Sequence, residues 1–255
     1  MKHVPKTFPE PDEFKSYRES NPKNTWDQFR DEVPETYRML RDELRKHQGG
    51  LCAYCEMSLI TENEQIAHFH PKSDNKDRNW ALEWNNLWLA CKGGTQSWLN
   101  DDEAYLPPLP ENISCDERKG NEILDEKIHS PNMIPVAPRI FRYEQQPDRI
   151  EICPDEENCK IANLDIQKVH DTIKAFNLNC PRLSKARLSS HKQLEQAIKK
   201  LRHSNIQNQL LGFHSLAEHH LKRNKDGLWP QFFTLIRWRF KNYAEQYLES
   251  INFQG

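Results

Sequence analysis

The chain carries the motif Cys52-Ala-Tyr-Cys55 one residue after Gly49-Gly50, and the rest of its fold can be worked out from this motif. Two cysteines separated by two residues after a glycine turn have the local geometry of a knuckle that offers two thiolates to a tetrahedral zinc ion. The site needs two more ligands, and the same segment offers Cys91 and Cys115. Four thiolates leave no open coordination position, so the spacing predicts a structural zinc site. A redox CxxC motif beside two buried thiols is the alternative.

The composition excludes several classes of protein. The chain has 255 residues, 29% of them charged, and a mean hydropathy of -0.94. It contains no run of about 18 apolar residues, and no apolar stretch follows the first lysines, so we expect neither a spanning helix nor a signal peptide. We therefore expect a cytoplasmic protein that does not bind membranes. Seven cysteines in that compartment do not indicate a disulfide framework.

Charge is divided unevenly along the chain. Residues 160–255 carry 16 Lys and Arg against 7 Asp and Glu, whereas residues 1–159 carry 20 against 31. The net charge of -2 thus combines a basic half of +9 with an acidic half of -11. A basic half suits a polyanion, and it equally suits the acidic half of the same chain or an acidic partner.

Hydrophobic periodicity predicts an α+β protein that is mostly α-helical. Apolar residues recur at spacings of three and four from Thr25 to Gly49, and Pro34 within this pattern indicates two helices. A strand pair is expected around 140–143 and 149–153. Four more helices are expected over 166–176, 183–201, 210–221 and 232–251. The expected regions are an N-terminal arm and helix (1–50), a core that holds the cysteines (51–128), a Pro-rich connector (129–163) and a basic helical region (164–255).

Further motifs accompany the cysteines in a fixed order. They are Ile66-Ala-His-Phe-His-Pro-Lys-Ser73, Trp84-Asn-Asn-Leu87, Cys115-Asp-Glu-Arg-Lys-Gly-Asn121 and Leu178-Asn-Cys-Pro-Arg-Leu183. With Leu51-Cys-Ala-Tyr-Cys-Glu56, this order resembles the HNH nuclease superfamily and its zinc-stapled ββα-metal fold. It is most similar to the PtuB-type HNH proteins of retrons and of the Septu anti-phage system. The similarity extends from Leu51 to the start of the C-terminal helices.

The resemblance implies a role for each matching polar residue. His68 matches the general base, since a neutral imidazole can take a proton from water near pH 7. Asn86 matches the amide that holds the loop and the histidine, and Asp116 matches a ligand of catalytic Mg²⁺ or Mn²⁺. A structural histidine and a turn asparagine are the alternatives. The candidates for contact with substrate phosphates, which are otherwise solvated surface residues, are Lys72, Arg118 and Lys119.

Position 67 departs from the pattern of this family. The residue before the first histidine is usually an acidic metal ligand, but here the sequence reads Ile66-Ala67-His68. A methyl group cannot coordinate a hard cation, so only Asp116 of the two expected ligands remains. We interpret Ala67 as an inactivating substitution, either engineered or arisen by natural degeneration. His70 is a conceivable substitute ligand, but we expect it to be a neighbour of His68 on one face of the strand.

A second departure lies after Cys91. Zinc-stapled HNH cores often end with a second CxxC, and here Gly94 stands where its second cysteine would be. Cys115 must then supply the fourth thiolate across the insertion 93–113. We expect this proline-containing insertion to form a loop beside the active groove and to influence substrate choice.

The resemblance also implies partners. It predicts a PtuA-type ATPase and, in retron systems, a reverse transcriptase with its RNA-DNA hybrid, since the chain itself has no Walker-type phosphate loop. The implied activity is that of a metal-dependent endonuclease that hydrolyses phosphodiester bonds of DNA or RNA, including tRNA, as a toxic effector. The alternative is a non-catalytic zinc module that binds nucleic acid or bridges proteins.

Overall fold

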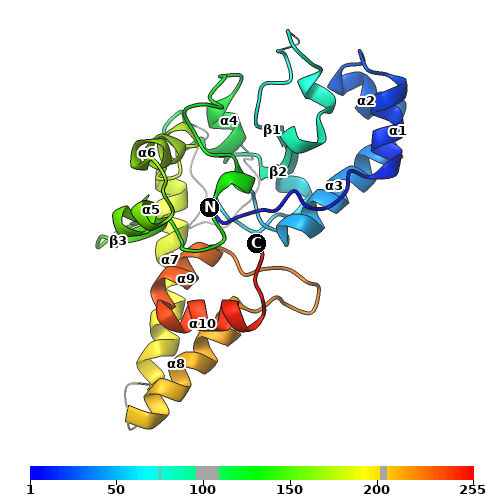
Figure 1. Cartoon of the computed structure of the whole chain (residues 1–255). Coiled ribbons are helices and arrows are strands. Elements are labelled where there is room, and N and C mark those ends of the chain that lie inside the picture. The colour runs from blue at the N-terminus through cyan, green and yellow to red at the C-terminus, as the bar shows by residue number, and fades with distance from the viewer. Residues whose placement is uncertain (75, 96–108, 202–205) are drawn as a thin grey trace.

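The computed structural model describes residues 1–74, 76–95, 109–201 and 206–255, and within these residues the chain is α+β, with about half of it in helices (Figure 1). No helix in these ranges is both long enough and apolar enough to cross a bilayer. The strands are β1 (Glu64–His68), β2 (Leu87–Cys91), β3 (Phe141–Gln145) and β4 (Ile150–Pro154). The helices are α1 (Asp12–Ser20), α2 (Trp26–Glu32), α3 (Pro34–Gln48), α4 (Cys115–Lys119), α5 (Glu156–Ile161), α6 (Ile166–Ala175), α7 (Pro181–Leu201), α8 (Ile206–Leu221), α9 (Phe233–Phe240) and α10 (Asn242–Ser250).

The N-terminal helices follow the signals of the sequence. Thr25 and Gln28 form a capping box at the start of α2, because each side chain accepts a hydrogen bond from the other residue's backbone N–H. Pro34 is the first residue of α3, which confirms the expected division into two helices. Gly49 ends α3 with φ +63, a left-handed conformation that costs glycine little. The chain then turns into the cysteine knuckle.

The first sheet is an antiparallel pair that carries the HNH-like motifs. β1 and β2 pair from Glu64 opposite Cys91 to His68 opposite Leu87. Gln48, at the end of α3, fixes this sheet to the knuckle: its amide nitrogen donates to the carbonyls of Leu51 and Leu89, and its amide oxygen accepts from the Leu89 N–H. α4 packs against β2, so two strands and a helix form one unit around the cysteines.

The second sheet pairs β3 with β4 and confirms the expected hairpin around Pro147. The short helix α5, which periodicity did not predict, follows it. Asp155 caps α5 by accepting a hydrogen bond from the Asn158 N–H. α6 then packs against β4 and α4, so the hairpin lies beside the cysteine core rather than apart from it.

The C-terminal region is a group of helices. α7 extends from the core toward α8, α9 and α10, which pack on one another (Figure 1). The prediction of a single helix over 232–251 is wrong. α9 ends at Phe240, Lys241 adopts φ +51, and α10 begins at Asn242, because a residue in the left-handed region cannot continue an α-helix.

Candidate metal centre and active site

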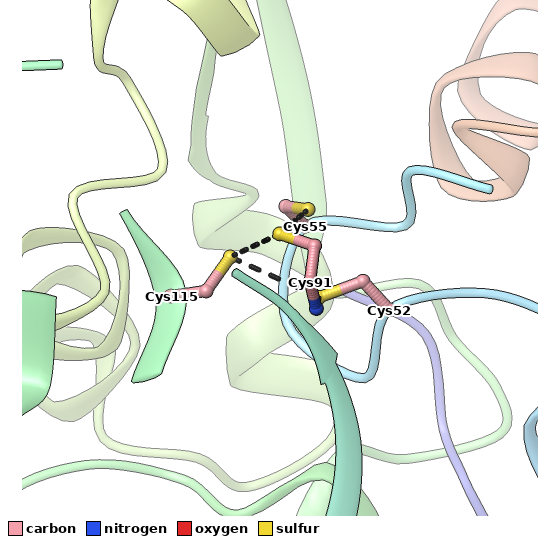
Figure 2. Close-up of side chains that lie close together, drawn as sticks. All are labelled: Cys52, Cys55, Cys91 and Cys115. Carbon is pink, nitrogen blue, oxygen red and sulfur yellow. Dashed lines mark hydrogen bonds between the residues drawn. The ribbon is translucent and has the colours of Figure 1, made fainter. Parts of the chain in front are cut away.

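Four cysteine sulfurs point toward one another in the core (Figure 2). Cys52 and Cys55 come from the knuckle, Cys91 from the end of β2 and Cys115 from the start of α4. The Sγ–Sγ distances are 3.8 Å for Cys52–Cys115, 3.7 Å for Cys55–Cys91 and 3.7 Å for Cys91–Cys115. A tetrahedral ion with Zn–S bonds of about 2.3 Å requires sulfurs about 3.8 Å apart. The described sulfurs therefore have the spacing of a zinc site.

The chemistry of the cluster also suits a closed metal site. All four thiols are buried, whereas a redox CxxC motif needs a thiol that a partner can reach. None of them is bonded to another sulfur. Hydrogen bonds from the thiols of Cys115, Cys52 and Cys55 lower the pKa of Cys91, and the charge of Arg182 lowers it further. The four cysteines could hold zinc. The ion would displace the thiol protons and balance part of the negative charge of the resulting thiolates.

Arg182, the second residue of α7, lies against this cluster, and its side chain is almost completely buried. Nη2 donates to Ser114 Oγ at 2.7 Å, and Nη1 lies 3.0 Å from Met57 Sδ. Burial alone would lower the pKa of Arg182. The negative charges that Cys91, Cys55 and other cysteines carry as thiolates raise it, and the net shift is upward. The guanidinium is thus held in its charged form beside the cysteines.

His68 ends β1 and is 7% exposed. Its Nε2 lies 3.0 Å from the carbonyl oxygen of Ala81, and the indole of Trp26 on α2 meets the imidazole edge to face. Because a carbonyl only accepts hydrogen bonds, Nε2 carries the proton and Nδ1 keeps the free lone pair. Burial lowers the pKa of His68 to about 4, so the ring is neutral at pH 7.

Asn86 fastens the loop between the two strands. Its side-chain oxygen accepts from the His70 N–H at 2.6 Å, and its nitrogen donates to the carbonyls of His70 and Trp80 at 2.9 Å each. These three hydrogen bonds fix the segment that follows His68. The Asn86 amide therefore holds the backbone of this loop in place, and both of its N–H donors are already used, so it cannot donate to a substrate.

Lys72 and Lys119 lie close enough to both His68 and Asp116 for their charges to act on each of these two side chains. Burial raises the pKa of Asp116 to about 6, against the opposing effect of the Lys119 charge. Lys119 is buried and donates to the Gly120 carbonyl, whereas Lys72 and Arg118 are exposed. A cation bound by Asp116 would favour its charged form.

Comparison with models of known protein families finds no match. Comparison with curated proteins finds an Escherichia coli protein named "Retron Ec83 putative HNH endonuclease", which is 36% identical over 210 residues and aligns with 73% of this chain and 78% of its own length. The chain belongs to the retron-associated HNH endonucleases. A Vibrio cholerae protein named "Retron Vc95 putative HNH endonuclease" is 34% identical over 55 residues, which cover 21% of this chain and 27% of that protein.

At position 67 this retron-associated chain has a completely buried methyl group. Ala67 is 0% exposed and lies opposite Trp88 in the sheet. His70 lies beyond the end of β1, so the expectation that it would follow His68 on one face of the strand is wrong. It stacks on Trp80, and its Nδ1 and Nε2 lie 3.0 Å and 3.3 Å from Asp125 and Asp74. The chain turns after His68, so the alternation of a strand no longer applies there.

The insertion 93–113 is described only at its ends, and residues 96–108 lie outside the described residues. At its start Gly93 has φ +62, and its carbonyl accepts from the Ser114 N–H at 3.0 Å. At its end Asn177 donates to the carbonyls of Glu111 and Ile113. The two ends are therefore both anchored near Cys115.

Two residues with buried or partly buried polar contacts in this region, Glu56 and Lys6, were not predicted from the sequence. Glu56, directly after the knuckle, is buried and receives hydrogen bonds from the N–H and hydroxyl of Thr234, and it pairs with the amino group of Met1 at 2.9 Å. Lys6 Nζ donates to the carbonyls of Trp84 and Leu87. A carboxylate directly after two clustered cysteines was a usable signal for Glu56, but no local pattern indicated Lys6.

His68 is expected to stay neutral across the physiological range. Its pKa lies below that of free imidazole because burial penalises the cation, so the ring should carry its proton on Nε2 at every pH from about 5 to 8. Two-dimensional NMR of ¹⁵N-labelled histidine rings reports both protonation and tautomer. A titration midpoint near 6.5 would contradict the lowered pKa, and a proton on Nδ1 would contradict the assignment of the free lone pair to that atom.

Proposed function

We propose that this chain is an HNH endonuclease of the metal-dependent kind that hydrolyses phosphodiester bonds of DNA or RNA, with tRNA among the possible RNA targets, and that Ala67 has inactivated it. The observation that carries the proposal is the membership of the chain in the retron-associated HNH family, and the four-cysteine cluster and the nearness of Lys72 and Lys119 to both His68 and Asp116 support it. The order of β1, β2 and α4 supports a ββα-metal core.

Each of the described side chains could perform a different task in the hydrolysis of the phosphodiester bond. The free Nδ1 of His68 can accept a proton from a water molecule, which then attacks phosphorus. Lys72 and Lys119 can balance the charge of the phosphate, and Asp116 could hold Mg²⁺ or Mn²⁺. Such a cation would stabilise the charge that develops on the phosphate and the leaving oxygen. The four cysteines would hold zinc as a structural ion and take no part in the chemistry.

The proposal includes a role and partners. The chain would be the toxic effector of a retron or Septu anti-phage complex with a PtuA-type ATPase, joined by a reverse transcriptase and its RNA-DNA hybrid in a retron. Its basic half, 160–255, would face these acidic or phosphate-bearing partners. The four regions 1–50, 51–128, 129–163 and 164–255 would differ in role but fold together, since one hydrophobic cluster contains buried residues of all four.

The second candidate is a non-catalytic zinc module that binds nucleic acid or bridges proteins. Ala67 favours it, because the buried methyl group removes a metal ligand that the family uses. We propose that this substitution leaves the chain catalytically inactive and that the rest of the site is retained.

Cleavage assays in the Ala67→Glu background test the nuclease proposal. With the partner proteins and Mg²⁺ or Mn²⁺, His68→Ala should lower cleavage of DNA or total RNA by at least about 100-fold, since general-base catalysis contributes roughly that factor. His170→Ala, a change of an exposed histidine on α6, is the matched control and should cleave normally. Cleavage that is equal in the His68 and His170 variants would rule out His68 as the base.

A further inference from the structure

The guanidinium of Arg182 is buried, and it forms no ion pair with a described carboxylate. No acidic side chain among the described residues lies within 4 Å of it, its Nε has no hydrogen-bond partner there, and only 7% of the residue is exposed. A buried cation is costly unless an opposite charge compensates for it. Among the described residues, the compensating charge must therefore come from groups other than carboxylates.

The cysteine site is the only described cluster of ligating groups, and it lies next to Arg182. Arg182 donates to Ser114 Oγ, and the Ser114 hydroxyl lies 3.6 Å from Cys115 Sγ. Four thiolates around a divalent ion carry a net charge of about -2, which is also unfavourable in a buried site. The positive charge of Arg182 and the net negative charge of the metal-loaded cysteine site would therefore compensate for each other.

Gly94 explains how Arg182 comes so close. A Cβ atom on Gly94 would lie 2.7 Å from Arg182 Nε and 3.2 Å from its Cδ, so the arginine occupies the space above the glycine. This is the position at which zinc-stapled HNH cores often carry the second cysteine of a CxxC. Here an arginine from α7 fills that place while Cys115 supplies the fourth sulfur.

We propose that Arg182 is the counter-ion of the four-cysteine metal site and couples metal binding to the docking of α7. Arg182 is a positioning residue: it acts on the sulfurs through its charge and through Ser114, and it coordinates no metal. Metal binding strengthens the hold on Arg182, and docking of Arg182 strengthens metal binding by the same factor. The inference rests on the proposed zinc site.

The test compares the zinc affinity of full-length variants by competition with a chromophoric chelator. Arg182→Met keeps an unbranched apolar stem but removes the charged guanidinium, and it should weaken zinc binding by about 10-fold to 100-fold, the usual effect of losing a partner of metal ligands. Arg182→Lys keeps the charge and should recover most of the loss. Cobalt absorption bands of the thiolates give a second readout that does not depend on nuclease activity.

Arg237→Met is the matched control. Arg237 is also a buried arginine, but it pairs with Glu245 and donates to the Val136 carbonyl, so its loss should leave zinc affinity unchanged. Equal zinc affinity in Arg182→Met and the unaltered chain, or an equal loss in both methionine variants, would overturn the role of Arg182. An unaltered chain that binds neither zinc nor cobalt would overturn the proposed metal site itself.

Discussion

Replacing Cys115 with serine is expected to remove zinc from the protein and to prevent stable folding of its core. The four sulfurs join the knuckle, β2 and α4, so loss of one sulfur removes a link between three short elements. Structural zinc in small sites contributes about 10 to 16 kcal/mol of apparent binding free energy, whereas whole domains are stable by only about 5 to 15 kcal/mol. We therefore expect the cooperative thermal transition of the core to disappear.

Zinc content and thermal unfolding together check this prediction. The unaltered chain should contain about one zinc per molecule, as a single four-thiolate site requires. Cys153→Ser is the matched control because Cys153 is a partly exposed cysteine outside the cluster. It should keep both the zinc and the melting temperature. A Cys115→Ser protein that holds a full complement of zinc would show that the four sulfurs do not act as one site.

Replacing Ala67 with glutamate is expected to create metal-dependent nuclease activity where the unaltered chain has little. The new carboxylate would join Asp116 as a second oxygen ligand for Mg²⁺ or Mn²⁺ next to His68. A gain of about 3 kcal/mol in transition-state stabilisation corresponds to roughly a 100-fold increase in rate, and metal catalysis supplies several kcal/mol. Cleavage of DNA and of total RNA by the reconstituted complex measures the gain and identifies the substrate class.

The same substitution should also change stability in a way that depends on metal. Position 67 is completely buried, so an unpaired carboxylate there is costly, and Mg²⁺ or Mn²⁺ should raise the melting temperature of the glutamate variant specifically. Ala67→Gln has nearly the same size without the charge and serves as the control for both measurements. If the glutamate variant stays inactive with its partners and Mn²⁺ present, Ala67 is not the cause of the missing nuclease activity.

Local patterns predicted much of the fold and of the metal site. The spacing of Cys52 and Cys55 after two glycines, and the return of Cys91 and Cys115, predicted the cluster that the structure contains. Pro34 predicted the boundary between α2 and α3 because its ring fixes φ and removes an N–H. These features depend on neighbours in sequence or on chemistry that few arrangements satisfy.

Contacts between distant segments could not be predicted in this way. The pairing of Glu56 with Thr234 and the contact of Arg182 with Ser114 join residues far apart in sequence, and nothing near either residue specifies its partner. The break at Lys241 was missed for another reason. The apolar period continues across it, so periodicity alone does not register a single residue in the left-handed region.

The length of α7 sets the distance between the cysteine cluster at one end of this helix and the residues at its other end. Its 21 residues span about 32 Å at the usual rise of an α-helix, close to the length of one turn of a DNA duplex. Arg182 anchors one end at the cysteine cluster, and the other end reaches Leu201 near the start of α8. A molecule bound at that far end would therefore lie about one helical repeat of DNA from the cysteine cluster.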